Sequence, residues 1–429
     1  MDANASKFLE TGRVFLRIGL LNFGGPAAQI SLMHRILVSE KQWLTEEEYT
    51  HALNVAMLLP GPEALQVAIY AGWLRHGIRG GLISGPLFIL PGFVVIMALS
   101  VLYATSQQVP IMSGLFLGIQ AATIGIVIEA LFKVAGRALK GTVQGLIALT
   151  AFCLLSLDLV PYGAIVAMAG FAGYFLIRSQ PPTQIWQSET PSNARSPNGA
   201  LSVVIYHGGI WLLIFGCIVL FAGRQSVYFE LFTYFSHLAF VAFGGAYAML
   251  SAVTLTAVTD FRWLSADAMV TGLGLAETTP GPLVLVLCFV GFQAAANQGI
   301  GAGLLGGAIT GLALFLPSFL FIFLAAPHLE RLRSIPALTS ALSGITAAVV
   351  GVIGHLSIWF GLHFLFRSVS TITLFNYGRA AMPDISTLNP IALWLAAVCA
   401  FVLFRTRFAL AGSLATGAAL GALAGLLGG

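Results

Sequence analysis

Apolar runs of membrane-spanning length follow one another along most of the chain. Roughly 20 consecutive apolar residues are enough for a helix to cross a bilayer. The first half of the sequence carries apolar runs at residues 13–37, 50–74, 82–103, 111–132, 143–157, 159–177 and 201–221, of which those at 143–157 and 159–177 are shorter. A similar series follows after residue 223. The pattern predicts an all-α polytopic membrane protein with about 12–13 transmembrane segments.

Two of these runs contain a sequence that cannot continue a regular helix. Pro60-Gly61-Pro62 lies in the middle of the run at 50–74, and Pro280-Gly281-Pro282 lies inside a later run. Each proline lacks an N–H group and clashes with the preceding turn. Lipid offers no partner for the freed backbone groups, so such a break persists only where it is buried in protein or lines a polar cavity. Two broken helices at corresponding places in two halves indicate the binding site of a transporter.

The two breaks belong to an internal repeat. Residues 220 positions apart match in three separate motifs, which are Phe-Gly-Gly at 23 and 243, Trp-Leu at 43 and 263, and Pro-Gly-Pro at 60 and 280. Further along, the spacing becomes 226 positions, as in Leu-Pro at 90 and 316. Chance would not keep several motifs in one register, so the chain is predicted to hold two copies of one unit.

The repeat divides the chain into four parts. We assign residues 1–177 to the first transporter repeat and residues 223–429 to the second. Residues 178–200 are rich in Pro, Ser, Gln and Asn and are expected to form an exposed linker. Residues 201–222 are expected to form a connecting transmembrane span.

Basic residues in the loops predict that the two repeats are inverted. Lys and Arg near the ends of spans favour the cytoplasmic side. Arg75 and Arg79 make one loop of the first repeat basic, whereas the corresponding loop at 293–303 is uncharged. The next loop of the second repeat carries Arg331 and Arg333, and its counterpart in the first repeat is uncharged. The single span between the repeats also reverses the orientation of the second repeat relative to the first. In this arrangement the N-terminus is cytoplasmic.

Composition supports a membrane protein and excludes several other classes. Of the 429 residues 58% are hydrophobic and only 8% are charged, whereas soluble domains have about 25% charged residues. The net charge of +4 comes without a basic stripe, so nucleic acid is not expected as a partner and the lipid bilayer is. The four cysteines and eight histidines show no metal-binding spacing, and no phosphate-binding loop is present. We expect no metal, cofactor or enzymatic activity.

The paired breaks predict a site for an anion. A helix that restarts after a bend presents unpaired N–H groups and the positive end of its dipole. Glycines without a Cβ allow close approach, and neutral side chains would add hydrogen bonds. The expected binding residues are Asn22, Gly24, Gly25, Pro26, Gln29, Pro60, Gly61, Pro62, Gln66, Gly244, Gly245, Thr278, Thr279, Pro280, Gly281 and Pro282. The alternative is that proline and glycine only kink and pack these helices.

Glu63 and Glu277 flank the two breaks. An ionisable residue inside a membrane span is costly and marks function, and a desolvated carboxyl group has a raised affinity for protons. When protonated it would tolerate a neighbouring anion, and when ionised it would repel one. Both residues are therefore candidates for coupling anion movement to protons. The alternative for Glu63 is that it stabilises the first turn of the restarting helix.

Several long motifs resemble the chromate ion transporter family. The segments at 23–35, 51–54 and 57–64 resemble the first half of that family, and those at 243–247 and 272–282 resemble the second. The second set includes Tyr247, which joins the expected binding residues. The resemblance covers both halves, so the chain matches the long, two-domain form. Ala28, Val55, Ala56 and Leu65 depart from the residues that are usual in the family.

The resemblance implies a multi-pass protein of the bacterial inner membrane that exports chromate and confers chromate resistance. It also implies two oppositely oriented halves. Chromate is a divalent tetrahedral oxyanion similar to sulfate. The leading hypothesis is therefore a secondary active chromate exporter, with proton exchange as its energy source. The alternative is an anion channel, or a transporter for sulfate-like oxyanions. The oligomeric state stays open, with a homodimer among the options.

Overall fold

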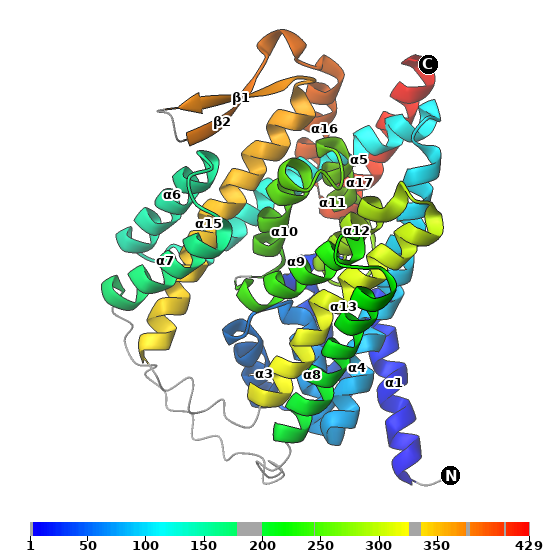
Figure 1. Cartoon of the computed structure of the whole chain (residues 1–429), viewed down its shortest axis with the longest axis vertical. Coiled ribbons are helices and arrows are strands. Elements are labelled where there is room, and N and C mark those ends of the chain that lie inside the picture. Colours follow the sequence, from blue (N-terminus) through cyan, green and yellow to red (C-terminus); the bar gives the residue numbers. More distant parts are fainter. Residues whose placement is uncertain are drawn as a thin grey trace. The chain divides into compact units, whose positions relative to one another are not determined.

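The computed structural model describes residues 3–177, 200–243, 245–325, 336–374, 378–406 and 409–428 (Figure 1). Helices form most of this part of the chain. They are α1 Ala3–Leu21, α2 Gly25–His34, α3 Glu46–Leu58, α4 Glu63–Ser106, α5 Pro110–Ala138, α6 Thr142–Ser156, α7 Tyr162–Leu176, α8 Ala200–Phe221, α9 Val227–Val241, α10 Ala246–Leu255, α11 Ala266–Thr278, α12 Val286–Ala296, α13 Ile300–Ala325, α15 Pro336–Leu365, α16 Pro390–Arg405 and α17 Ala409–Gly428.

Some of these helices are long enough to span a membrane. Among the described helices, α4, α5, α13, α15 and α17 are long and apolar enough to cross a membrane. The remaining apolar helices are shorter, namely α6, α7, α9, α16, residues 206–221 of α8, and residues 283–296. Such lengths suit a helical membrane protein, and the count of about 12–13 spans stays a prediction.

One of the predicted spans differs from a single straight helix. The predicted span at 50–74 consists of two helices, because α3 ends at Leu58 and α4 begins at Glu63. Helix α4 itself breaks at His76 (φ −137°, ψ 18°) and Gly77 (φ 63°, ψ −152°). The segment is therefore divided at two places, by the bend at Pro60-Gly61-Pro62 and by the break at His76 and Gly77.

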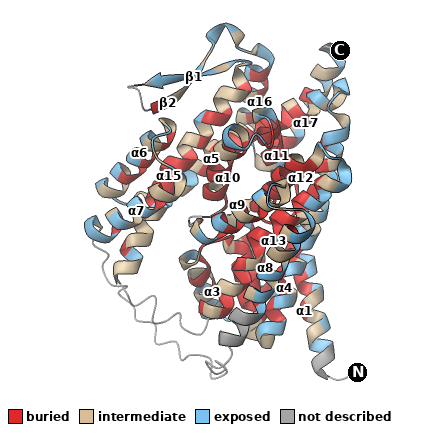
Figure 2. Ribbon diagram, viewed as in Figure 1, coloured by how far each residue is buried: buried red, intermediate tan, exposed pale blue. Residues whose placement is uncertain are grey.

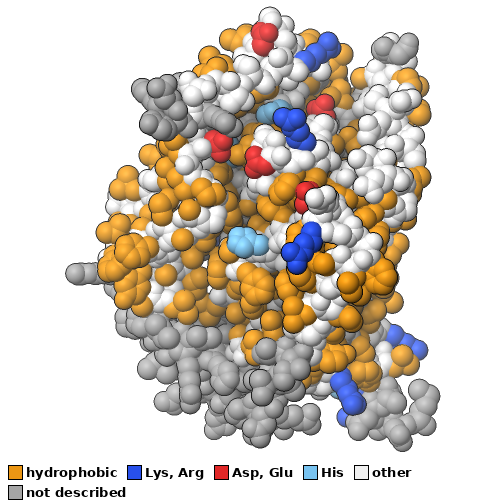
Figure 3. All heavy atoms as spheres, in the orientation of Figure 1, with side chains coloured by type: hydrophobic (Ala, Val, Ile, Leu, Met, Phe, Trp, Pro, Cys, Tyr) orange, Lys and Arg blue, Asp and Glu red, His pale blue; other side chains and the backbone are white. Residues whose placement is uncertain are grey.

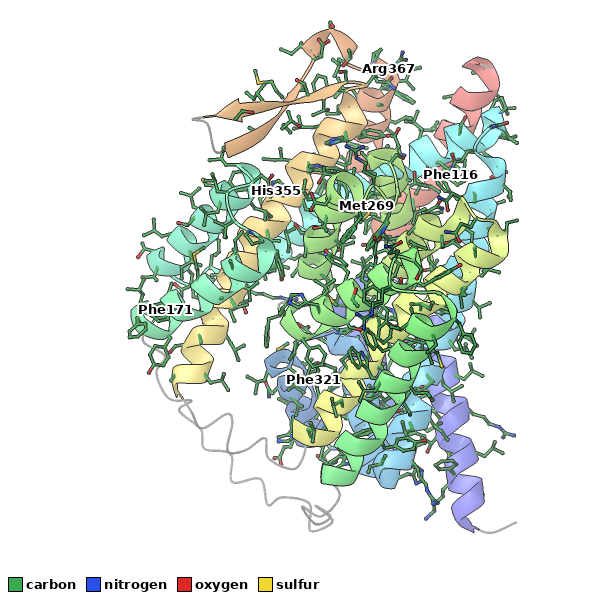
Figure 4. The ribbon with its side chains drawn as sticks, in the orientation of Figure 1. Phe116, Phe171, Met269, Phe321, His355 and Arg367 are labelled. Atoms are coloured by element: carbon green, nitrogen blue, oxygen red, sulfur yellow. The ribbon has the colours of Figure 1, made fainter. Side chains whose placement is uncertain are left out.

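Many hydrophobic side chains of the described residues are exposed on the surface. Hydrophobic side chains are spread over the described part of the face shown in Figure 3, with scattered charges between them. Large side chains are among the most exposed, including Phe132, Phe171, Leu220 and Phe221. Figure 4 shows Phe171 pointing outward from α7. Apolar area on this scale is rare on soluble monomers and marks a membrane or protein contact.

The sequence repeat recurs in the local backbone. A π-helical turn at Arg35–Glu40 has a counterpart at Thr256–Asp260. Gln42 and Arg262 both have positive φ angles, of 51° and 54°. The N–H groups of the tryptophans that follow them donate to backbone carbonyls at the same distance, 2.8 Å in each copy. Two segments 220 positions apart thus fold alike.

Compact units do not coincide with the two repeats. One unit contains Met1–Met97, Ser179–Met249 and Thr279–Thr339, and the other contains Ala98–Arg178, Leu250–Thr278 and Ser340–Gly429. Each unit takes segments from both halves of the sequence. The predicted divisions at 177 and 223 therefore remain statements about the sequence repeat. Most of the predicted linker, residues 178–199, and the basic residues Arg331 and Arg333 lie outside the described residues.

The first unit is built on close contacts between small residues. Helix α13 packs against α12, α9 and α8. A Cβ on Gly291 of α12 would lie 2.8 Å from the carbonyl oxygen of Gly306 in α13. The first repeat has the same arrangement, since a Cβ on Gly72 would lie 2.6 Å from the carbonyl oxygen of Gly80. Buried side chains concentrate along these helices (Figure 2).

The second unit pairs helices of one repeat with helices of the other. Helix α5 of the first repeat packs along α16 and α17 of the second (Figure 1). Gly114 and Gly118 of α5 meet Gly417 and Gly421 of α17, with no room for a Cβ between them. Conversely, α15 of the second repeat packs against α6 and α7 of the first repeat through Ala347, Ala348, Val352 and their neighbours. Such small-residue contacts are typical of membrane helices.

A two-stranded β-hairpin adds a small element to the helical fold that the sequence predicts. Strands β1 (Val369–Leu374) and β2 (Gly378–Pro383) pair antiparallel, with Val369 opposite Pro383 and Leu374 opposite Gly378. The sequence of β1 is VSTITL, which is rich in β-branched residues that favour strands. The fold is helical throughout the rest of the described residues, apart from connecting turns.

Candidate functional site

Both Pro-Gly-Pro bends place glycine in a conformation that other residues rarely adopt. Gly61 has a φ of +120° and Gly281 a φ of +105°. Helix α3 ends before the first bend and α4 begins at Glu63 after it. Helix α11 ends before the second bend, and a short 3-10 turn at Leu283–Leu285 leads into α12. Each bend therefore exposes backbone groups that the helices leave without partners.

Each bend is hydrogen-bonded to the other repeat. The N–H of Gly61 donates to the carbonyl oxygen of Ala242 at 3.0 Å, and the N–H of Gly281 donates to that of Asn22 at 2.7 Å. Asn22 and Ala242 directly precede the two Phe-Gly-Gly motifs and are themselves 220 positions apart. The loop before one Phe-Gly-Gly thus holds the bend of the opposite repeat, in both directions.

A second pair of contacts also connects each bend to the opposite repeat. Gly61 is packed closely enough that a Cβ there would lie 3.0 Å from Ser318 Oγ in α13. Gly281 is packed so that a Cβ would lie 3.4 Å from the Cα of Gly92 in α4. Gly92 and Ser318 each follow a proline of the Leu-Pro motif and are 226 positions apart. Neither residue was among the expected binding residues, although the shared spacing carried the signal.

Two glutamines bind the carbonyl groups of the bends. Gln29 Nε2 donates to the carbonyl oxygen of Gly281 at 2.7 Å, and Gln66 Nε2 donates to that of Pro60 at 2.7 Å. A carbonyl oxygen only accepts hydrogen bonds, so each amide must present its NH₂ group to the bend. The amide oxygen of each glutamine therefore points away from that carbonyl.

Several polar atoms beside the bends are buried and unpaired. Asn22 and Gln66 are 0% exposed and Gln29 is 1% exposed. Within the described residues, Asn22 Nδ2, Asn22 Oδ1, Gln29 Oε1 and Gln66 Oε1 have no hydrogen-bond partner. Buried polar atoms nearly always have partners, and one left without any costs about 1–3 kcal/mol. All of these atoms belong to residues that the sequence analysis selected for binding.

Glu63 lies at the start of α4, close to the Phe-Gly-Gly loop of the second repeat. It is half-buried, and a Cβ on Gly245 would lie 3.5 Å from its Oε1 atom. Gly245 has a φ of +83°, and Tyr247 beyond it is half-buried. Gly244 lies outside the described residues. The carboxylate is therefore near one of the expected glycines and at the helix end where negative charge is favoured.

The loop of the first Phe-Gly-Gly motif is more open. Gly24 and Gly25 have φ angles of +94° and +76°. Gly24 is exposed, whereas Gly25 and Pro26 are partly buried. Pro26 lies in the first turn of α2, where its missing N–H group leaves no helix hydrogen bond unmade.

The residues just before the second bend divide between the two compact units. Glu277 and Thr278 end α11 and belong to the second unit, whereas Thr279 begins a segment of the first. Glu277 is 4% exposed. Thr278 is exposed, and its hydroxyl donates to the carbonyl oxygen of Leu275 at 2.7 Å within its own helix. Thr279 is buried.

A charged cluster lies away from the bends, where α1 meets the break in α4. Lys41 Nζ donates to Glu10 Oε1 at 2.8 Å, and Arg75 Nη2 lies 3.9 Å from Glu10 Oε2. The Arg75 guanidinium also lies 3.6 Å from the centre of the Trp43 ring. The hydrogen bond from Lys41 lowers the pKa of the Glu10 carboxyl group below its ordinary value. His76, next to the break, is hydrogen-bonded to Thr11 at 2.9 Å.

Long apolar helices, paired helix breaks and buried polar atoms at those breaks define a membrane protein of the transporter class. The chain belongs to the chromate transporter family. The sequence model of that family, described as "Chromate transporter", matches residues 9–174 and 229–426. Proteins of this family are transporters and not enzymes.

Relatives from three bacteria resemble the chain over most of its length. The chain is 32% identical to a "Chromate transport protein" of Cupriavidus metallidurans over 79% of each chain. It is 29% identical to a "Chromate transport protein" of Pseudomonas aeruginosa, over 80% of this chain and 79% of the relative. A "Probable chromate transport protein" of Synechococcus elongatus is 26% identical over 90% of this chain and 93% of the relative. No solved structure matches the chain.

Proposed function

We propose that the protein is a secondary active transporter that exports chromate across the inner membrane of a bacterium and so confers chromate resistance. Membership of the chromate transporter family and the similarity to relatives described as chromate transport proteins support this substrate. The N-terminus is cytoplasmic in this proposal, as the basic loops of the first repeat indicate.

The exchange of hydrogen bonds at the bends is the observation that carries the transport mechanism. Gly61 binds the loop before one Phe-Gly-Gly motif, and Gly281 binds the loop before the other. This reciprocal arrangement is what two inverted repeats related by a pseudo-two-fold axis would produce. Opening toward either side of the membrane then requires equivalent movements in the two repeats, while the bends stay at the centre.

The chemistry of the proposed site suits an oxyanion held by neutral groups. Residues 18–33, 50–74 and 263–300 contain the two bends and the first Phe-Gly-Gly motif, and no Lys or Arg occurs in them. Affinity would come from backbone N–H groups, from the start of α4 and from the side-chain amide of Asn22. Without a fixed cation in the site, the bound anion can be released once the site opens.

Glu63 and Glu277 are the proposed sites of proton coupling. Glu63 lies beside Gly245, and Glu277 is buried three positions before Pro280. A carboxylate close to an oxyanion repels it, whereas the protonated acid does not. Coupling of chromate movement to protons would follow if each carboxyl group changes its protonation state as the anion enters or leaves.

Uptake of radiolabelled chromate into inverted membrane vesicles tests this proposal. Vesicles with the protein should accumulate chromate at a rate that changes when a pH gradient is imposed, and excess sulfate should compete only weakly. Vesicles without the protein provide the control. Absence of chromate uptake would reject the substrate, and uptake that ignores the imposed pH gradient would favour an anion channel.

A further inference from the structure

Asn22, Gln29 and Gln66 present more hydrogen-bond acceptors than donors to a ligand. Gln29 Oε1, Gln66 Oε1 and Asn22 Oδ1 are acceptors, whereas Asn22 Nδ2 is the one donor among the unpaired atoms of these three residues. The orientation of each glutamine follows from the bend that it holds, because its NH₂ group donates to a backbone carbonyl. The unpaired atom is therefore an oxygen in both glutamines.

A fully ionised oxyanion cannot satisfy these oxygens. Every oxygen of a dianion such as sulfate accepts hydrogen bonds and none donates. Bringing such an ion beside a buried amide oxygen would leave that oxygen unpaired and repel the ion electrostatically. A singly protonated oxyanion differs because it carries one O–H group. Chromate takes up its first proton in the neutral pH range, whereas sulfate does so only in strong acid.

We propose that the site binds the singly protonated form of chromate, whose own hydroxyl group donates a hydrogen bond to Gln29 Oε1 or Gln66 Oε1. The inference rests on the proposed function, since it concerns the same site and the same anion. Asn22 Nδ2 and the backbone N–H groups donate to the other oxygens of the ion. A protein site that hydrogen-bonds a ligand O–H rejects the analogue that lacks it, because its own polar group is then left unpaired. The two glutamines thereby exclude sulfate.

Titratable side chains of the protein near the bends could also make binding depend on pH. Their effect must be distinguished from that of the ligand's own proton. They are Glu63 at the start of α4, Tyr247 near the start of α10, His34 at the end of α2, and Glu277 before the second bend. His34 pairs with Glu46 at 2.7 Å on an exposed part of the protein. The pH dependence of binding is therefore also measured in Glu63→Gln and Glu277→Gln, where a slope that comes from the ligand persists.

Equilibrium binding of radiolabelled chromate to the purified full-length protein tests the inference, with equal pH throughout so that no gradient contributes. The dissociation constant, expressed as total chromate, should rise about tenfold per pH unit above the protonation midpoint of chromate. Expressed as hydrogen chromate, it should stay constant. Inorganic phosphate, which is tetrahedral and carries a hydroxyl group near neutral pH, should compete at least about tenfold better than sulfate.

Two variants connect the effect to the glutamines. Gln29→Met and Gln66→Met remove an acceptor at nearly constant volume, and each should reduce the preference for phosphate over sulfate by about tenfold. Gln120→Met is the matched control, because Gln120 is also buried but its amide donates to Thr271 Oγ1 at 2.7 Å in the second unit. The competition between phosphate and sulfate on the unmodified protein remains decisive if a variant fails to fold.

Each outcome separates this inference from the proposed function. Chromate that fails to bind at any pH overturns the proposed function. Chromate that binds in proportion to its total concentration, with sulfate competing as well as phosphate, overturns only the inference, and shows that water hydrogen-bonds the glutamine oxygens. Binding that requires Na⁺ at every pH also overturns it, since a cation then occupies the acceptors.

Discussion

The N–H of Gly281 donates to the carbonyl oxygen of Asn22 at 2.7 Å, so the bend of the second repeat is anchored on the loop between α1 and α2. Gln29 Nε2 binds the carbonyl of the same glycine at 2.7 Å. Both polar groups of Gly281 are therefore held by the first repeat. Any movement of α1 or α2 that accompanies transport must carry this bend with it or break these bonds.

Replacing Gly281 with alanine should destabilise the protein and impair transport. The Cβ would lie 2.8 Å from Leu285 Cδ1, at a φ of +105° that alanine rarely adopts. We expect a loss of about 1–3 kcal/mol in unfolding free energy, and a chromate transport rate reduced at least about tenfold. Thermal unfolding in detergent and uptake into proteoliposomes measure the two effects.

Gly223→Ala is the control for backbone strain alone. Gly223 has a φ of +84°, and a Cβ there would meet nothing within 4 Å. It should lower stability to a smaller extent and leave transport intact. Equal transport losses in the two variants would show that the contacts of Gly281 have no special role.

Gly118→Ala should disrupt the contact between α5 and α17. The added Cβ would clash directly with the backbone of Gly417, and overpacking of this kind costs about 1–3 kcal/mol. Gly136→Ala on the same helix is the control, since Gly136 is exposed and a Cβ there meets nothing within 4 Å. That control should stabilise the helix by about 0.5–1 kcal/mol. Unfolding midpoints that shift alike in both variants would contradict the packing contact.

Glu277→Gln should reduce the dependence of chromate flux on an imposed pH gradient to the part that comes from the ligand's own proton, while leaving the fold intact. The amide cannot take up a proton, so coupling through this residue would be lost. Glu63→Gln should have the same effect if both carboxyl groups take part. Flux in proteoliposomes is compared with and without the gradient, and circular dichroism confirms folding. If the flux through a variant still responds fully to the gradient, the glutamate replaced in that variant does not couple protons to transport.

The Glu10 carboxylate should stabilise the folded protein at neutral pH and lose this effect in acid. The hydrogen bond from Lys41 lowers the pKa of Glu10 below its ordinary value, so the folded state favours the ionised form. The contribution is fully present above the unfolded pKa and disappears as the pH falls through the folded value. The difference in melting temperature between the unmodified protein and Glu10→Gln should therefore shrink in acid.

A double-mutant cycle with Lys41→Met isolates that ion pair. Both side chains are partly exposed, so the coupling should be small and should weaken at high salt. A difference in melting temperature that persists unchanged in acid would show that Glu10 acts through packing and not through its charge.

The sequence repeat predicted more of the local structure than of the packing. Residues in one register produced the same π-helical turns and the same bends, because local backbone geometry follows local sequence. The pairing of Gln29 with Gly281 could not be predicted in this way, since nothing in either segment specifies the other. The same holds for the compact units, in which α5 packs on helices from the far end of the chain.

The β-hairpin after α15 was missed although its sequence carried a signal. Val369, Thr371 and Thr373 alternate along β1, which is typical of a strand. The segment is too short to form an apolar run of spanning length, so the hydropathy pattern predicts only a connection between helices there. The candidate site was easier to select, because buried amides and paired bends are unusual inside membrane spans.

The packing of α5 against α17 affects the order in which this protein can mature. A ribosome adds about 5–20 residues per second, so α17 follows α5 by on the order of 10–60 s. During that time, Gly114 and Gly118 lack the helix that they contact in the finished protein. Helices α6 and α7 wait in the same way for α15. Insertion into the membrane and tertiary folding are therefore separate events for the first half of the chain. Until the final helix is made, the insertion machinery or the surrounding lipid must contact the glycine-rich faces of its helices.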